Sequence, residues 1–112
     1  MAYEVEGKVI ESDAHGYLVN ASDWDEKVAA VIAAAEGIAL TEAHWDVMNY
    51  LRDEYLNNGG NQPNERTILK AMSDKWGRSA TTKEMYLLFP HMPSKQGAKV
   101  AGLPETRRKG GY

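Results

Sequence analysis

The sequence predicts a single, mainly α (α+β) domain: a small helical bundle with an N-terminal β-hairpin and a flexible C-terminal arm. Apolar residues recur at helical spacing through most of the chain, a short segment near the start alternates apolar and charged residues, and residues 105–112 are polar and basic. The chain has 112 residues, of which 43% are hydrophobic and 26% charged, which is enough for one core. We therefore divide it into a domain over residues 1–104 and a mobile basic tail over residues 105–112.

The N-terminal segment predicts the hairpin. Residues 3–10 alternate for the most part between apolar and charged side chains, which is typical of a strand with one buried face. The turn-rich residues 12–16 follow, and residues 17–19 then provide a returning strand. Because a lone hairpin is only marginally stable in water, we expect it to pack against the helices.

Five helices are predicted. In five segments apolar residues recur at helical spacing, and each segment follows a residue that can begin a helix. Breaks that contain glycine or proline separate them. The expected spans are 20–36 with Asn20 or Ser22 as the cap, 42–57 after Thr41, 64–76 with a start near Pro63 or Asn64, 81–89 with a Thr81–Glu84 capping box, and 93–101 beginning at Pro93. On the second and third of these helices, we expect Trp45 and Trp76 to be buried in the core.

The residue types exclude several kinds of chemistry. The chain contains no cysteine, which excludes disulfides, thiolate metal sites and a thiol nucleophile. Its three histidines, His15, His44 and His91, do not have the spacing of a metal site, and the carboxylates at residues 23–26 fit the first turn of a helix. We therefore predict no metal, no cofactor and no catalytic residue. The longest apolar run, residues 28–35, is too short to cross a membrane, and no signal peptide is evident, so we expect a cytoplasmic protein.

Charge is divided unevenly along the chain. Residues 1–56 contain twelve acidic and three basic side chains, whereas residues 57–112 contain four acidic and ten basic ones. This division indicates either an anionic partner for the second half or attraction between the two halves of one domain. The predicted helix–turn–helix over residues 64–89 has five basic residues: Arg66, Lys70, Lys75, Arg78 and Lys83. They are candidates for contacts with nucleic-acid phosphates. Alternatively, they form an ordinary solvent-exposed helix face.

Three segments are specific enough to compare with known families: LTEAHWDVMNYLR at residues 40–52, YLLFP at residues 86–90 and KQGAKVAGLP at residues 95–104. The same comparison includes Gly7-Lys8, Gly16-Tyr17-Leu18, Asp23-Trp24, Pro63, Arg66 and Lys70. Together these segments resemble the DsrC/TusE family of small sulfur-carrier proteins, and the likeness covers the chain apart from residues 105–112. The resemblance implies a helical bundle with an N-terminal hairpin and an extended C-terminal arm.

The resemblance also implies a function that depends on cysteine. Members of the family carry sulfur on a penultimate cysteine of the arm, which reaches into a partner's active site, and those that act with sulfite reductase have a second cysteine just before the KxAGLP stretch. Here these positions hold Gly111 and Ala98, and neither residue can form a thiolate, a persulfide or a disulfide. The altered ending with Arg107, Arg108 and Lys109 favours a natural cysteine-free paralogue over an engineered variant.

The sequence therefore predicts a non-catalytic member of this family, not an enzyme, that binds or regulates protein partners of the sulfur-relay or sulfite-reductase type. The candidate partner-binding residues lie in and after the arm: Lys95, Lys99, Arg107, Arg108, Lys109 and Tyr112. Two alternatives stay open, a DNA-binding regulator that uses the basic helix–turn–helix-like half and a sulfur-transfer relay subunit like the cysteine-containing members. The sequence does not determine the partner's identity or the oligomeric state.

Overall fold

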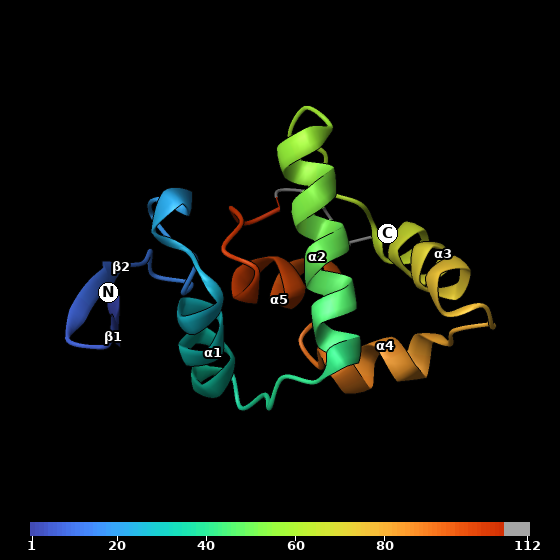
Figure 1. The fold of residues 1–112 in the computed structure, drawn as a ribbon, viewed down its shortest axis with the longest axis horizontal. Coiled ribbons are helices and arrows are strands. Elements are labelled where there is room, and N and C mark those ends of the chain that lie inside the picture. Colours follow the sequence, from blue (N-terminus) through green and yellow to red (C-terminus); the bar gives the residue numbers. More distant parts are fainter. Residues whose placement is uncertain (107–112) are drawn as a thin grey trace.

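The computed structural model describes residues 1–106 and confirms a mainly helical fold with an N-terminal hairpin (Figure 1). Two antiparallel strands, β1 (Ala2–Val5) and β2 (Lys8–Glu11), precede a short 3-10 helix, η1 (Ala21–Asp23). The α-helices are α1 (Glu26–Ala35), α2 (Glu42–Asn57), α3 (Glu65–Trp76), α4 (Thr82–Leu88) and α5 (Pro93–Val100). Within residues 1–106, none of the helices has the length and apolar character needed to cross a membrane.

Helix α5 lies at the centre of the fold and contacts each of the other four α-helices. The hairpin packs against α1 at one end of the molecule, and α3 and α4 lie at the other end (Figure 1). The largest fully buried side chains come from several helices and from the segment after α5: Phe89, Ile32, Met48, Ile68, Met72 and Leu103. Helix α5 and the first residues after it therefore belong to the core.

The hairpin turns earlier than the sequence analysis predicted. The reversal lies at Glu6 and Gly7, whose φ angles are +51° and +81°, and it joins the paired residues Val5 and Lys8. A two-residue loop with both φ angles positive matches the right-handed twist of the two strands. The sequence analysis did not predict this turn, because Glu6 and Gly7 lie within a stretch that alternates for the most part between apolar and charged side chains.

The turn that was predicted at residues 12–16 is also present, as a second reversal of the chain. Ser12 and Leu18 pair as an isolated antiparallel bridge. The Asp13 carboxylate accepts the backbone N–H groups of His15 at 2.8 Å and Tyr17 at 3.1 Å, which satisfies the tight backbone of the reversal. Tyr17 and Leu18 are thereby placed in the buried interior.

Helix starts were predicted more accurately than the hairpin. The residues expected at the starts of α2 to α5 are confirmed: Thr41, Asn64, Thr81 and Pro93. The start of the first helix was wrong, because Asn20 accepts the Ser22 N–H and caps η1. Helix α1 begins later, where the Asp25 carboxylate accepts the Val28 N–H at 2.9 Å.

The two tryptophans expected in the core are only partly buried and pack against its edge, so this expectation was wrong. Trp76 Nε1 donates a hydrogen bond to Asp46 Oδ2 at 2.7 Å. Trp45 lines a surface concavity together with Trp24 and Arg52. The spacing of apolar residues identifies the helix face that packs on the core. A tryptophan at the edge of that face keeps one side of its indole ring in contact with solvent.

The division between domain and tail stays a prediction. Glu105 and Thr106, the first two residues of the predicted tail, contact the fold: Glu105 Oε1 lies 2.9 Å from His15 Nδ1, and Thr106 is buried. The remaining tail residues that the sequence analysis named lie outside the described residues: Arg107, Arg108, Lys109, Gly111 and Tyr112.

Candidate partner-binding site

The last residue of α5 and the segment after it, residues 100–106, are called the arm root here, and two side chains from the first half of the chain hold it in place. Trp24 Nε1 donates a hydrogen bond to the Val100 carbonyl oxygen at 2.9 Å, and Arg52 Nη1 donates to the Ala101 carbonyl oxygen at 2.8 Å. The guanidinium carbon of Arg52 lies 3.9 Å from the centroid of the Trp24 ring, which is a cation–π stack. The two side chains thus support each other as well as the arm root.

Gly102 allows the arm root to pass closely over the indole of Trp24. Its φ is +75°, and a Cβ atom at this position would lie 2.3 Å from Trp24 Cδ1. Beyond it, Leu103 is fully buried and Gln62 Nε2 donates a hydrogen bond to the Pro104 carbonyl oxygen at 2.8 Å. The arm root therefore has a defined course from α5 to Pro104.

Ala98, at the position where the resemblance places a cysteine, is buried. Its exposed fraction is 2%, and its carbonyl oxygen accepts the Leu103 N–H at 2.9 Å. The backbone of α5 at this position thus closes the turn into the arm root. A sulfur atom in place of a methyl hydrogen of Ala98 would lie inside the core for as long as the arm root keeps this course.

Lys99, one of the predicted partner-binding residues, is engaged within the fold. Its Nζ lies 3.4 Å from both carboxylate oxygens of Glu36 and 5.2 Å from the centroid of the Tyr17 ring, and its side chain is only 17% exposed. Gln96 Nε2 also donates to Glu36, at 3.0 Å. The Lys99 charge is therefore compensated by α1, and a role of Lys99 in binding stays a prediction.

Lys95, the other described candidate in α5, is half-buried and forms no ion pair within residues 1–106. Its carbonyl oxygen accepts the Tyr17 hydroxyl at 3.1 Å. Burial raises the pKa of Tyr17, and the nearby carboxylates of Glu105, Glu36 and Asp13 raise it further. Tyr17 therefore stays protonated at physiological pH and remains a donor to α5.

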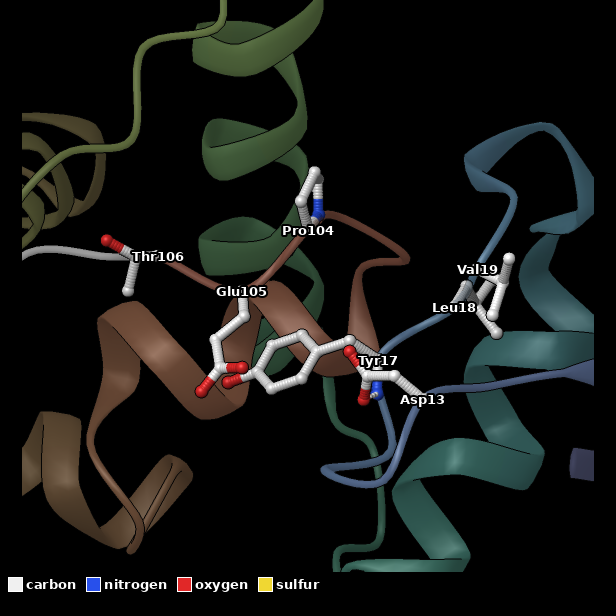
Figure 2. A pocket seen from close by; sticks show the side chains of 7 residues that line it. All are labelled: Asp13, Tyr17, Leu18, Val19, Pro104, Glu105 and Thr106. Carbon is white, nitrogen blue, oxygen red and sulfur yellow. Dashed lines mark hydrogen bonds between the residues drawn. The ribbon is translucent and has the colours of Figure 1, made fainter. Parts of the chain in front are cut away.

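A cavity of about 480 Å³ lies between the reversal near residue 15 and the arm root (Figure 2). The side chains that line it come from these two segments: Asp13, Tyr17, Leu18, Val19, Pro104, Glu105 and Thr106. His15 bonds to Glu105 at its edge, and this contact raises the pKa of the His15 imidazole. Because the cavity has both apolar and acidic walls, it suits protein side chains better than a small anion.

His44 has a structural role. Its Nδ1 accepts the Thr41 backbone N–H at 3.1 Å, and its Nε2 lies 2.8 Å from the Leu88 carbonyl oxygen. Burial lowers the pKa of His44, so the neutral imidazole, with Nε2 as the donor, connects the start of α2 to the end of α4. Among residues 1–106, no group of three His, Asp or Glu side chains is arranged to bind a metal ion.

The five basic residues of the predicted helix–turn–helix do not act as one surface. Arg78 forms an ion pair with Glu84, and Lys75 Nζ lies 3.9 Å from Asp46 Oδ1. The remaining three, Arg66, Lys70 and Lys83, have no ion pair in the described part of the chain. Two of the five charges are thus neutralised by carboxylates, and this arrangement does not support the nucleic-acid alternative.

Sequence reasoning missed the residues that fix the arm root. Trp24, Arg52 and Gln62 reach it from positions 76, 49 and 42 residues earlier in the chain. No local pattern predicts such distant pairs. The available signal was that Trp24 and Arg52 both belong to segments that support the family resemblance.

Comparison with known proteins agrees with this architecture. The family model described as "DsrC like protein" matches residues 4–108. The chain belongs to this family. It is 45% identical over 103 residues to the sulfurtransferase TusE of Yersinia pseudotuberculosis, with 91% of this chain and 94% of that protein covered.

Two solved structures of DsrC proteins share the fold. The solution structure of Allochromatium vinosum DsrC has a TM-score of 0.85 and 40% identity, and 96% of each chain is covered. The oxidized gamma-subunit of the dissimilatory sulfite reductase (DsrC) from Archaeoglobus fulgidus has a TM-score of 0.86 and 32% identity, with 96% of this chain and 98% of that chain covered. The chain is thus a cysteine-free DsrC-like protein of the sulfur-relay family.

Proposed function

We propose that this DsrC-like protein binds sulfur-relay or sulfite-reductase partners without carrying sulfur itself. The observation that supports the proposal is the combination of a firmly held arm root with a sequence that has no cysteine. Acceptance of a sulfur atom by a carrier requires a thiolate nucleophile, and the methyl group of Ala98 offers none. Shape and surface charge are what this chain has left for interaction with a partner.

Regulation by competition is the simplest form of such a role. One relative is named a sulfurtransferase and another a subunit of dissimilatory sulfite reductase, so both kinds of assembly are candidate partners. A cysteine-free copy that occupies the same docking site would keep a sulfur-carrying relative out of it. The contacts we propose are Lys95, the rim of the cavity beside Glu105, and the tail from residue 107 onward, in a cytoplasmic complex.

A reconstituted sulfur-transfer assay tests this function. A cysteine-containing TusE or DsrC protein is loaded with sulfur by its donor enzyme, and the rate is measured as this protein is added. We expect the rate to fall with the concentration of this protein, while mass spectrometry finds no sulfur adduct on it.

Two results would contradict the proposal. A sulfur adduct on this chain would exclude the non-carrier role, and an unchanged transfer rate at saturating concentration would exclude competition. A variant that ends at residue 106 is the matched control, because it keeps the described fold and removes the proposed tail contacts. It should inhibit more weakly while its circular dichroism spectrum is unchanged.

A further inference from the structure

A shallow groove between α3 and α4 is not used by the proposed function. It has a volume of about 190 Å³, and the two helices that form it lie at the end of the molecule opposite the hairpin (Figure 1). The groove is lined by Glu65, Arg66, Leu69, Thr82, Met85 and Tyr86. Leu69 is partly exposed and provides an apolar surface on which an aliphatic side chain can pack, and Met85, which is 3% exposed, also lines the groove.

One exposed cation lines this groove, and two more lie on the helices that form it. Arg66 lines the groove, and Lys70 follows it one turn later on α3. On α4, Lys83 lies three residues before Tyr86, which also lines the groove. Both lysines are therefore on or next to the helix faces that form the groove. None of the three has an ion pair within residues 1–106, in contrast to Lys75 and Arg78. Unpaired surface cations around a concave surface create a positive local potential.

The carboxylates nearby do little to cancel this potential. Glu65 is buried and accepts the Ser94 N–H at 2.7 Å, and burial raises the pKa of its carboxyl group. Glu84 is held by Arg78. Asp74, one turn after Lys70, is exposed and is the one acidic side chain of α3 that could offset a lysine of the groove.

The groove has the mixed character of a protein-binding surface. Leu87, which follows Tyr86, is 72% exposed, so α4 presents an unburied aliphatic side chain at this end of the molecule. Arginine, tyrosine and methionine are enriched at protein interfaces, and all three line the groove. A nucleic acid would contact cations through its phosphates and would gain nothing from an apolar floor of leucine and methionine.

We propose that this groove docks an acidic protein segment that inserts one aliphatic side chain between α3 and α4. Charge complementarity to Arg66, Lys70 and Lys83 selects the acidic partner, and Leu69 and Met85 receive the apolar anchor. This second surface goes beyond the proposed function, because it includes neither the arm root nor the tail. A loss of binding here would leave inhibition through the arm unchanged.

The test is a titration of the full-length, nitrogen-15-labelled protein with a synthetic peptide at low salt. The peptide has about 14 residues, a length at which an isolated helix is only marginal, and it carries one central leucine among glutamates. We expect chemical-shift changes centred on Leu69, Met85 and Tyr86, and an affinity that falls as salt is added. Replacement of the peptide's leucine by serine, which keeps its charge, should weaken binding about tenfold.

A pair of protein variants separates local from overall charge. Arg66→Glu and Lys8→Glu each reverse one exposed charge without an ion pair in the described residues, but Lys8 lies in the hairpin at the other end of the molecule. Arg66→Glu should weaken peptide binding about tenfold, whereas Lys8→Glu should change it less than about twofold.

Three outcomes would overturn the inference. They are the absence of any shift at the groove up to the solubility limit of the peptide, equal binding of the leucine and serine peptides, and equal effects of the two charge reversals. A short DNA duplex is titrated in parallel. If the duplex changes the chemical shifts of the same groove residues as the peptide does, the groove binds any negatively charged ligand, and the proposed specificity for a protein segment is wrong.

Discussion

The close approach of Gly102 to Trp24 predicts a large loss of stability for Gly102→Ala. The new Cβ would lie 2.3, 2.4 and 2.7 Å from three atoms of the Trp24 side chain, and the residue would have to keep φ at +75°. A positive φ costs an alanine roughly 1–2 kcal/mol. Forcing a methyl group into a packed contact costs roughly 1–3 kcal/mol more. We therefore expect the free energy of unfolding to fall by about 2–5 kcal/mol.

Gly37→Ala is a matched control for the backbone contribution. Gly37 has the same φ of +75°, but a Cβ there would meet nothing within 4 Å. This variant should lose only the roughly 1–2 kcal/mol of the strained backbone. The difference between the two variants therefore reports the contact between the arm root and Trp24.

Urea denaturation of both variants, followed by circular dichroism, measures the two losses. If the slope of the free energy against urea stays constant, the shift in midpoint can be converted into stability. Equal losses for Gly102→Ala and Gly37→Ala would show that the arm root does not pack on Trp24 as described. That result would remove the structural basis for a defined arm root.

Three further predictions concern the same region. Arg52→Lys keeps the charge but loses the planar stack and fixed donor geometry, so urea denaturation should show a loss of about 1–2 kcal/mol. The cysteine of Ala98→Cys should react with a thiol reagent at less than about one tenth of the rate of the cysteine of Ala14→Cys, because residue 98 is buried and residue 14 is exposed. Equal reaction rates would show that the arm root opens. Glu105 raises the pKa of His15. Their charged contact is therefore fully formed below the ordinary histidine pKa and is lost as the pH rises through the raised pKa. In Glu105→Gln, an NMR titration should find a lower pKa for His15 than in the unmodified protein.

The helices could be predicted because their signals are local. Thr41 and Thr81 each lie directly before the helix that they begin, and a single residue of context is enough to recognise such a cap. The hairpin turn could not be predicted in the same way. Its positive φ angles fall on Glu6 and Gly7, a pair that lacks the asparagine or aspartate typical of such loops, inside a stretch where apolar and charged side chains mostly alternate.

The candidate site was predictable only in part, for a physical reason. The position of Ala98 followed from the family resemblance, but its burial depends on how α5 packs among four other helices. Arg52 carries no sign in its own helix that it will stack on Trp24 and bond to Ala101. Such contacts are properties of the tertiary structure, since they join residues that only the completed fold brings together.

The packing of the arm root also explains how a chain without thiols can keep the shape of this family. Ala98 contributes a small buried Cβ and a backbone carbonyl that accepts the Leu103 N–H, and neither requires sulfur. The other supports of the arm root come from Trp24, Arg52 and Gln62, none of which takes part in thiol chemistry. The architecture of the arm root is therefore physically separable from sulfur transfer.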